Sequence, residues 1–311
     1  MTLATTGRVV CIGAANIDRK LTAKGPLHMG TSNPVRQHES FGGVARNVAE
    51  NLAHLGVAVS LVTAVGNDAA GRALLAHAVA SGIDVAGSIT LDGDASGTYT
   101  AILDERGGMA LALADMELYE QLVPDIVLPL AAPAALTVAD LNLPQETLAA
   151  LLEQVHPLVI VAVSEPKMAR LPRNLEGLRL LILNLGEMEA RLRRRIDGDT
   201  SLADACREVQ SQGVRDVIVT RGSSGVTYTT AGGIDHLTAS PVQVVDVTGA
   251  GDAFAAAVCW SLLDDPDDLA LACRRGMHLA GLTVGSPLTV LPANARIHAG
   301  PAPDGFPPSR E

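Results

Sequence analysis

Residues 242–263 read VQVVDVTGAGDAFAAAVCWSLL. The run 242–245 is strand-like, small residues occupy 249–251, and from 254 onwards apolar residues recur at helical spacing. A strand that passes through a turn of small residues into a helix is a building unit of α/β proteins. The first N–H groups of a helix have no partner within it and favour an anion. The stretch therefore predicts a strand, an anion hole and a helix, in this order.

Asp252 follows the small residues directly and would lie in the first turn of that helix. There it could take a proton from a hydroxyl while the amides of Gly249, Ala250 and Gly251 hold the charge of a transferred phosphoryl group. The alternative is structural: the small residues allow close packing of helix on strand, and Asp252 offsets the helix dipole. The other motifs of the chain favour the catalytic interpretation.

Apolar runs of strand length alternate with helical patterns along the rest of the chain. Strands are predicted at Val9–Ile12, Val57–Val62, Ala134–Val138, Val159–Val163, Leu180–Leu183 and Val217–Thr220. Helices are predicted at Val44–Leu55, Gly71–Ser81, Pro144–Gln154, Glu187–Arg195, Ser201–Gln212, Ala250–Leu263 and Leu269–Val284. This order predicts an α/β fold with a doubly wound, mostly parallel sheet and helices on both faces.

Two segments, residues 17–40 and 96–114, break this order because polar and apolar residues alternate in them without a helical period. We expect them to pair into a small β-sheet that forms a lid over one edge of the core. The core would then comprise residues 1–16, 41–95 and 115–300. The Pro-rich tail, residues 301–311, is predicted to be disordered.

The composition narrows the class of protein. The net charge is −11, which disfavours a protein that tracks nucleic-acid phosphates or binds anionic membranes through a broad basic face. The four cysteines lack C-x-x-C spacing, so neither a zinc site nor a disulfide framework is expected. We expect no secretory signal and no membrane span. Together these features predict a cytoplasmic protein.

A second motif lies in the first half of the chain, where Gly42 and Gly43 open a helical pattern that contains Asn47. Such glycines expose backbone N–H groups, and an Asn side chain can both donate and accept hydrogen bonds. Asn16 and Asp18 follow the first predicted strand and could complete a site for vicinal hydroxyls. Taken separately, the two glycines would be an ordinary turn and Asp18 a solvated carboxylate.

Two further motifs follow predicted strands of the second half. Asn184 and Glu187 come directly after one strand, where an Asn and an acid in the first turn could form a helix cap. The turn Thr220-Arg221-Gly222-Ser223-Ser224-Gly225 follows another strand and contains one positively charged residue, Arg221.

These motifs together resemble the ribokinase-like carbohydrate and nucleoside kinases, the PfkB family. The resemblance implies a ribokinase-like fold, ATP and Mg²⁺ as cofactors, and Asp252 as the catalytic base beside an anion hole formed by residues 249–251. It implies a sugar clamp around Asp18, with Gly43 and Asn47 completing it. Residues that would bind the nucleotide are Asn184, Glu187, Thr220, Arg221, Gly222 and Gly225.

The same resemblance implies two cation sites. Glu187 would act on Mg²⁺ through water, and the carboxylate of Asp246 is a candidate for K⁺. The chain departs from the family pattern at Ser164-Glu165-Pro166, where Asp-Pro is usual, which leaves the metal-side role of Glu165 open. Leu183 stands where a proline is frequent.

Within that family the chain is most similar to the pseudouridine kinases, which transfer the γ-phosphate of ATP to the 5′-hydroxyl of a C-nucleoside. The resemblance rests on the stretches at 12–18, 32–34, 41–52, 114–116 and 138–142. A nucleoside also needs polar partners for its base and a closing wall. Candidates, each of which could instead be a surface residue or a strand-end cap, are Ser32, Asn33, Thr98, Tyr99, Asp115 and Asn142.

Other functions remain open at this point. A dinucleotide oxidoreductase is disfavoured because residues 13–18 contain no G-x-G-x-x-G. A non-catalytic sugar-binding relative is disfavoured by the intact Asp252. Within the family, ribose, adenosine or fructose is the alternative substrate. We expect a homodimer formed through the lid sheet.

Overall fold

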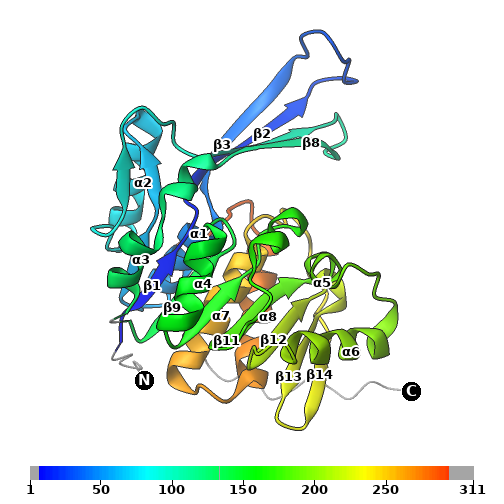
Figure 1. The fold of residues 1–311 in the computed structure, drawn as a ribbon. Helices are drawn as coiled ribbons and strands as arrows, with labels where there is room; N and C mark the ends of the chain where they lie inside the picture. The colour runs from blue at the N-terminus through cyan, green and yellow to red at the C-terminus, as the bar shows by residue number, and fades with distance from the viewer. Residues whose placement is uncertain (1–6, 133, 294–311) are drawn as a thin grey trace.

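The computed structural model describes residues 7–132 and 134–293. At its centre lies an eight-stranded sheet in the order β14-β13-β12-β11-β10-β9-β1-β4 (Figure 1). The neighbouring strands β4, β1, β9, β10, β11 and β12 pair in parallel. The hairpin β13–β14 pairs antiparallel, both within itself and with β12. The bounds are β1 Val9–Ile12, β4 Val59–Val62, β9 Leu136–Asp140, β10 Leu158–Val161, β11 Leu178–Asn184, β12 Asp216–Thr220, β13 Val226–Thr230 and β14 Gly233–Leu237.

Helices cover both faces of this sheet, so the predicted α/β class is confirmed. One core cluster packs α1, α2, α7 and α8 on one face, and a second packs α3, α4, α5 and α6 on the other. Side chains of β1 alternate between the two clusters. Val9 and Cys11 pack into the first, and Val10 and Ile12 pack into the second. The bounds are α1 Val44–His54, α2 Ala69–Ala80, α3 Pro124–Ala131, α4 Gln145–Gln154, α5 Leu185–Leu192, α6 Gly198–Gln210, α7 Ala250–Asp264 and α8 Leu269–Val284.

The structure departs from the predicted elements at residues 242–245, which form no strand. Val244 is 64% exposed, and the N–H groups of Val245 and Asp246 donate to the carbonyl of Val284 at the end of α8. The segment therefore caps a helix and does not join the sheet. The sequence analysis also left out the hairpin β13–β14, the helix α3 and the short helical turns η1 (Glu117–Gln121), η2 (Glu165–Arg170) and η3 (Gly222–Ser224).

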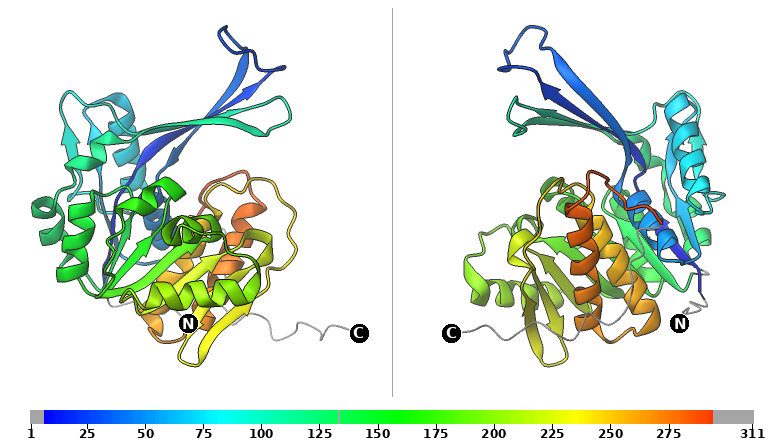
Figure 2. Two further views of the ribbon diagram at one scale, coloured as in Figure 1. Left: turned by 45° about the vertical axis from the view of Figure 1, so that its right-hand side comes forward. Right: turned by 180° about the vertical axis from the view of Figure 1, so that it is seen from behind.

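A separate four-stranded sheet, the lid sheet, has the order β3-β2-β7-β8. Its strands are β2 Asn16–Ala23, β3 Val35–Gly42, β7 Thr98–Leu103 and β8 Met109–Asp115, while β5 (Ala64–Gly66) and β6 (Ile89–Leu91) pair on their own. Two views show the lid sheet rising from the core and leaning over the half that holds α7 and α8 (Figure 2). The predicted disordered tail, residues 301–311, lies outside the described residues.

The register of the lid sheet separates its side chains into two faces. Asp18 pairs with Tyr99, and Lys20 with Ala101, so these four residues share the face that we call the inner face. Arg19 lies on the opposite, outer face, and so do Leu111 and Leu113 of β8. Among the described residues, no helix is long and apolar enough to cross a membrane.

The hydroxyl of Tyr119 fixes the chain where it passes from β1 into the lid sheet. This fully buried side chain accepts a hydrogen bond from the N–H of Ala15 at 3.1 Å and donates one to the carbonyl of Ala15 at 2.6 Å. The N–H and the carbonyl of Ala15 are buried, so without the Tyr119 hydroxyl they would lack a hydrogen-bond partner.

We expect Tyr119→Phe to lower the free energy of unfolding by about 1–3 kcal/mol, because it leaves the buried backbone groups of Ala15 without their partner. Urea unfolding followed by circular dichroism measures the change. Tyr228→Phe is the matched control, since its hydroxyl makes no hydrogen bond within residues 7–132 and 134–293. Equal stability of the two variants would contradict the anchoring role of Tyr119.

Candidate active site

The candidate active site lies at the carboxyl ends of the parallel strands, the usual position of ligand sites in open α/β sheets. Asp140 ends β9 and Asn184 ends β11, where it pairs with Thr220 at the end of β12. The first turns of α1 and α7 meet at the same edge, joined by a hydrogen bond from Asn47 to Asp252. Residues predicted from separate parts of the chain thus come together.

Asp252 lies in the first turn of α7, as predicted, and its carboxylate is directed toward α1. Asn47 Nδ2 donates to Asp252 Oδ2 at 2.7 Å. The pKa of Asp252 is raised to about 7, mainly by burial and also by the negative charges of Asp140 and Asp18, whereas Asn47 and Arg46 oppose the shift. A carboxylate that is half protonated near neutral pH is suited to accept a proton from a hydroxyl.

The turn before α7 has the shape that an anion hole needs. Gly249 is the N-cap at φ 80°, a left-handed conformation that favours glycine, and a side chain there would collide with the carbonyl of Thr289. Beside Gly251 the space is open, since a Cβ built there meets no atom within 4 Å. At the start of α7, a helix of 15 residues, the N–H of Ala250 closes the turn onto the carbonyl of Val247 at 3.3 Å, whereas the N–H groups of Gly249 and Gly251 donate to no group within residues 7–132 and 134–293.

The residues that were predicted to form a sugar clamp lie next to one another. Asn16 Nδ2 donates to Asp18 Oδ1 at 2.6 Å, and a side chain at Gly42 would collide with the Asp18 carboxylate. Gly43 begins α1 at φ 96°, where a side chain would collide with the carbonyl of Ala14. Burial raises the pKa of Asp18, although Asn16 opposes the shift. The clamp thus adjoins Asn47 and, through it, Asp252.

Asp140 organises this edge of the sheet, and the sequence analysis did not assign it a role. Its buried carboxylate accepts hydrogen bonds from the N–H groups of Ala14 at 2.9 Å, Ala45 at 3.0 Å and Asn142 at 2.8 Å. Burial raises its pKa, and the hydrogen bonds oppose that shift. An acidic residue at the end of an otherwise apolar strand was the signal that could have identified it.

Arg46 is the second residue without an assigned role. It is buried, forms an ion pair with Glu50, and donates to the carbonyl of Phe41 at 2.8 Å and to Asn47 Oδ1 at 2.6 Å. Burial lowers its pKa to about 10, so the guanidinium stays charged at neutral pH. It contributes positive charge next to Asp18 and Asp252 and orients the amide of Asn47.

Of the candidates for contact with a base, Tyr99 and Asn142 lie at the site. Tyr99 pairs with Asp18 on the inner face of the lid sheet, and Asn142 is buried. The Asn142 side chain accepts a hydrogen bond from Lys167, a residue that the sequence analysis did not consider. Lys167 reaches it from η2.

Four other candidates are not brought to Asp252. Ser32 and Asn33 lie in the exposed loop between β2 and β3, where Asn33 bonds to the backbone of His28 at 2.8 Å (Figure 1). Asp115 pairs with Thr98, which puts both on the outer face of the lid sheet, opposite Asp18. For Thr98 and Asp115 the physical reason is register, because neighbouring positions of a strand point to opposite faces. Ser32 and Asn33 lie beyond the ends of the strands, in the loop.

On the nucleotide side, Asn184 and Glu187 form a capping box at the start of α5. Asn184 Oδ1 accepts from the N–H of Glu187 at 2.9 Å, and Glu187 Oε2 accepts from the N–H of Asn184 at 2.7 Å. The helix cap that the sequence analysis gave as the alternative is therefore formed. Burial raises the pKa of Glu187, and the negative charge of the nearby Glu165 raises it further. Two adjoining carboxylates fit a partly hydrated Mg²⁺ completed by phosphate oxygens.

The predicted glycine turn lies next to this box. Thr220 pairs with Asn184, and the turn that follows contains Gly222 and Gly225 with positive φ. The side chain of Arg221 is engaged by Asp199, with 2.7 Å between Arg221 Nη1 and Asp199 Oδ1. Arg221 therefore brings positive charge to this edge together with a carboxylate that offsets it.

The site expected for K⁺ has a different arrangement. The carboxylate of Asp246 accepts a hydrogen bond from Lys20 Nζ, and Lys20 also donates to Thr248 Oγ1 at 2.8 Å. Thr248 in turn donates to Asp246 Oδ1 from its N–H at 2.9 Å and from its hydroxyl at 2.7 Å. These residues do not fit K⁺, because a positive group already contacts the carboxylate that would bind it.

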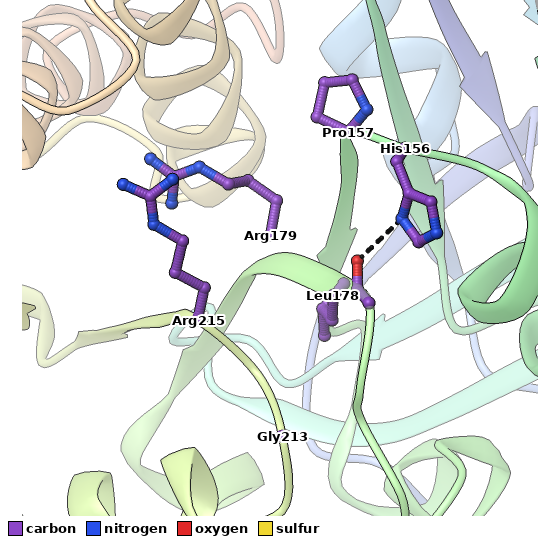
Figure 3. Close-up of a pocket in the computed structure, with 7 residues that line it drawn as sticks. His156, Pro157, Leu178, Arg179, Gly213 and Arg215 are labelled. Carbon is purple, nitrogen blue, oxygen red and sulfur yellow. Dashed lines mark hydrogen bonds between the residues drawn. The ribbon is translucent and has the colours of Figure 1, made fainter.

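A pocket elsewhere in the molecule lies at the opposite, amino ends of the strands (Figure 3). His156 Nδ1 lies 3.1 Å from the carbonyl of Gly177, and the nearby Arg179 and Arg215 are paired with Asp216 and Asp267. The pocket lies at the amino ends of the strands, whereas Asp252 lies at their carboxyl ends, and both arginines of the pocket are already paired with carboxylates. The pocket is therefore not part of the site around Asp252.

Comparison with known proteins gives the same family as the motifs. The model of the pfkB family carbohydrate kinases matches residues 6–296. The chain is 32% identical to the pseudouridine kinase of Escherichia coli over 81% of this chain and 83% of that protein. The structure of a carbohydrate kinase from Agrobacterium tumefaciens is 29% identical, with a TM-score of 0.75 over 91% of this chain and 92% of that one.

An Arabidopsis thaliana ribokinase, solved with ribose and ATP, shares the fold with a TM-score of 0.76 and 20% identity, over 90% of this chain and 93% of that one. The family match spans the core, the lid sheet and the turn at Asp252. The chain therefore belongs to the pfkB family of carbohydrate kinases and is a phosphotransferase.

Proposed function

We propose that this kinase transfers the γ-phosphoryl group of ATP to the 5′-hydroxyl of pseudouridine. The observation that carries the proposal is the Asp252 carboxylate, held by Asn47 at 2.7 Å beside the open first turn of α7, with its pKa raised to about 7. A second support is the 32% identity to a protein named pseudouridine kinase. Four buried free thiols are compatible with a cytoplasmic location.

In this mechanism Asp252 removes the proton from the acceptor hydroxyl as its oxygen bonds to the γ-phosphorus. The bond between that phosphorus and the bridging oxygen of ADP breaks, and Asp252 keeps the proton. The N–H groups at 249–251 hold the charge of the phosphoryl group during transfer. The positive charge of Arg46 limits the repulsion between Asp18 and Asp252.

Other residues bind and orient the two substrates. Asp18, Asn16 and Asn47 take the ribose hydroxyls, and Asn184 with the turn after β12 takes the nucleotide. Glu187 and Glu165 would hold Mg²⁺ through water, and the ion would neutralise charge on the phosphates. Asn142 and Tyr99 adjoin the clamp and are the candidates for contact with uracil.

We expect Asp252→Asn to lower kcat about 10²–10⁴-fold with little change in substrate affinity, because the amide cannot accept the proton. For the intact enzyme, kcat/KM should fall as the pH drops below about 7, since protonation of Asp252 removes the base. A coupled ADP-release assay from pH 5.5 to 8.5 measures both.

The matched control for this experiment is Asp265→Asn, an exposed acid at the other end of α7, which should retain full activity. Activity of Asp252→Asn within about threefold of the unchanged enzyme would refute the assignment of the base. So would a pH profile of the unchanged enzyme that stays flat through pH 7.

A substrate panel of pseudouridine, uridine, ribose, adenosine and fructose with ATP and Mg²⁺ tests the acceptor. We expect kcat/KM for pseudouridine to exceed the others by at least about tenfold, because a site with buried polar groups for one base rejects acceptors that leave them unpaired. Ribose, adenosine or fructose is the alternative, and equal or better turnover of ribose would reject pseudouridine. Binding of a sugar without ADP release would favour the non-catalytic alternative.

We further propose a homodimer formed through the outer face of the lid sheet. Leu111 and Leu113 are 49% and 54% exposed there, and an exposed apolar strand face is a common contact between copies. Light scattering should then give twice the monomer mass.

Replacing Leu111 and Leu113 together by Glu should return the protein to the monomer, because charge would be buried at the contact. Val79→Glu, which changes a 57% exposed apolar residue on α2, should leave the mass unchanged. A dimer that persists in the double variant would exclude this face.

A further inference from the structure

Lys20 lies on the inner face of the lid sheet and reaches the loop that precedes α7. Its ammonium group contacts Asp246 Oδ2 and lies 2.8 Å from Thr248 Oγ1. The two charged side chains are 27% and 30% exposed, so water screens their attraction only in part. A strand of the lid sheet and the loop before the anion hole are therefore joined by one ion pair.

Both oxygens of Asp246 are occupied in this arrangement. Oδ2 accepts from Lys20, and Oδ1 accepts from the N–H and the hydroxyl of Thr248. Thr248 directly precedes Gly249, the left-handed N-cap of α7. The position of the first N–H groups of α7 thus depends on Thr248, which depends on Asp246 and Lys20.

We propose that the ammonium group of Lys20 takes the place of a bound monovalent cation at Asp246, so that this kinase holds its anion hole in shape without K⁺. An ammonium and K⁺ carry the same charge, and a compact ammonium with three N–H donors suits a cluster of oxygen atoms. A second cation at this carboxylate would be repelled by the first. Lys20 is a positioning residue, because it acts through the loop and not on the reacting atoms.

The arrangement also couples the lid sheet to catalysis. Asp18 of the clamp and Lys20 are two positions apart on β2 and share its inner face. A ribose that draws Asp18 into place therefore fixes the strand that carries Lys20. The neighbouring Arg19 points to the outer face, where it pairs with Glu39 at 2.8 Å, so it offers a matched control on the same strand.

The test compares the unchanged protein, Lys20→Met and Arg19→Met in KCl and in choline chloride at equal ionic strength. For the unchanged protein and Arg19→Met, kcat should differ less than about twofold between the salts. Lys20→Met should lose about tenfold or more of kcat in choline chloride, and KCl or NH₄Cl should restore most of it. This measurement of kcat requires the proposed kinase function, and it is the only readout of the inference that does.

Thermal unfolding gives a readout that needs no activity. KCl should raise the Tm of Lys20→Met by about 2–4 °C relative to choline chloride, because a cation that binds only the folded state stabilises it. The Tm of the unchanged protein should be the same in both salts. If no acceptor is phosphorylated in either salt, the proposed function fails while this comparison still decides the role of Lys20.

Three results would overturn the inference. One is strong activation of the unchanged protein by K⁺. Another is full activity of Lys20→Met in choline chloride. The third is a loss in Lys20→Met that no monovalent cation restores and that appears as a higher KM for ATP, which would show that Lys20 contacts the phosphates instead.

Discussion

The buried carboxylate of Asp140 is the contact on which the site depends. It binds the N–H groups of Ala14 after β1, Ala45 in the first turn of α1, and Asn142 after β9. A buried charge of this kind is costly unless hydrogen bonds compensate it, and three backbone donors do so here. Because Asp140 sets where α1 begins, it also sets Asn47, and Asn47 holds Asp252. The position of Asp252, the proposed base, therefore depends on a residue of the sheet.

The same residue shapes the electrostatics of the site. Asp140 and Asp18 add negative charge around Asp252, and Arg46 supplies the buried positive charge among them. The result is a carboxylate whose pKa lies near neutrality, which neither a solvated acid nor one fully paired with a cation would have. Burial and like charge, arranged by the fold, thus give Asp252 its suitability as a base.

Much of the fold could be predicted from the sequence, because local patterns specify it. The strand Val9–Ile12 and the helix Leu269–Val284 match in full, since each is a continuous apolar or periodic run. The valines at 242–245 misled the prediction: their β-propensity is overridden by the bond to the end of α8. The glycine and carboxylate motifs also led to Asp18, Asn47 and Asp252. The contacts of Asp140 and Lys20 could not be predicted, because each joins segments that are far apart in the chain. Those of Arg46 are local, but its burial beside Asp18 and Asp252 follows from the tertiary fold.

The strand order also has a consequence for synthesis of the chain. β1 lies between β4 and β9, so its second neighbour does not exist until residue 140 has been made. Likewise β2 pairs with β7, and two helices and four strands lie between them in the chain. During translation the backbone groups at the edges of the first strands therefore stay unpaired until their partner strands are made. In that period they can bind chaperones or other nascent chains. The second edge of β1 can be paired only after Asp140 has left the ribosome.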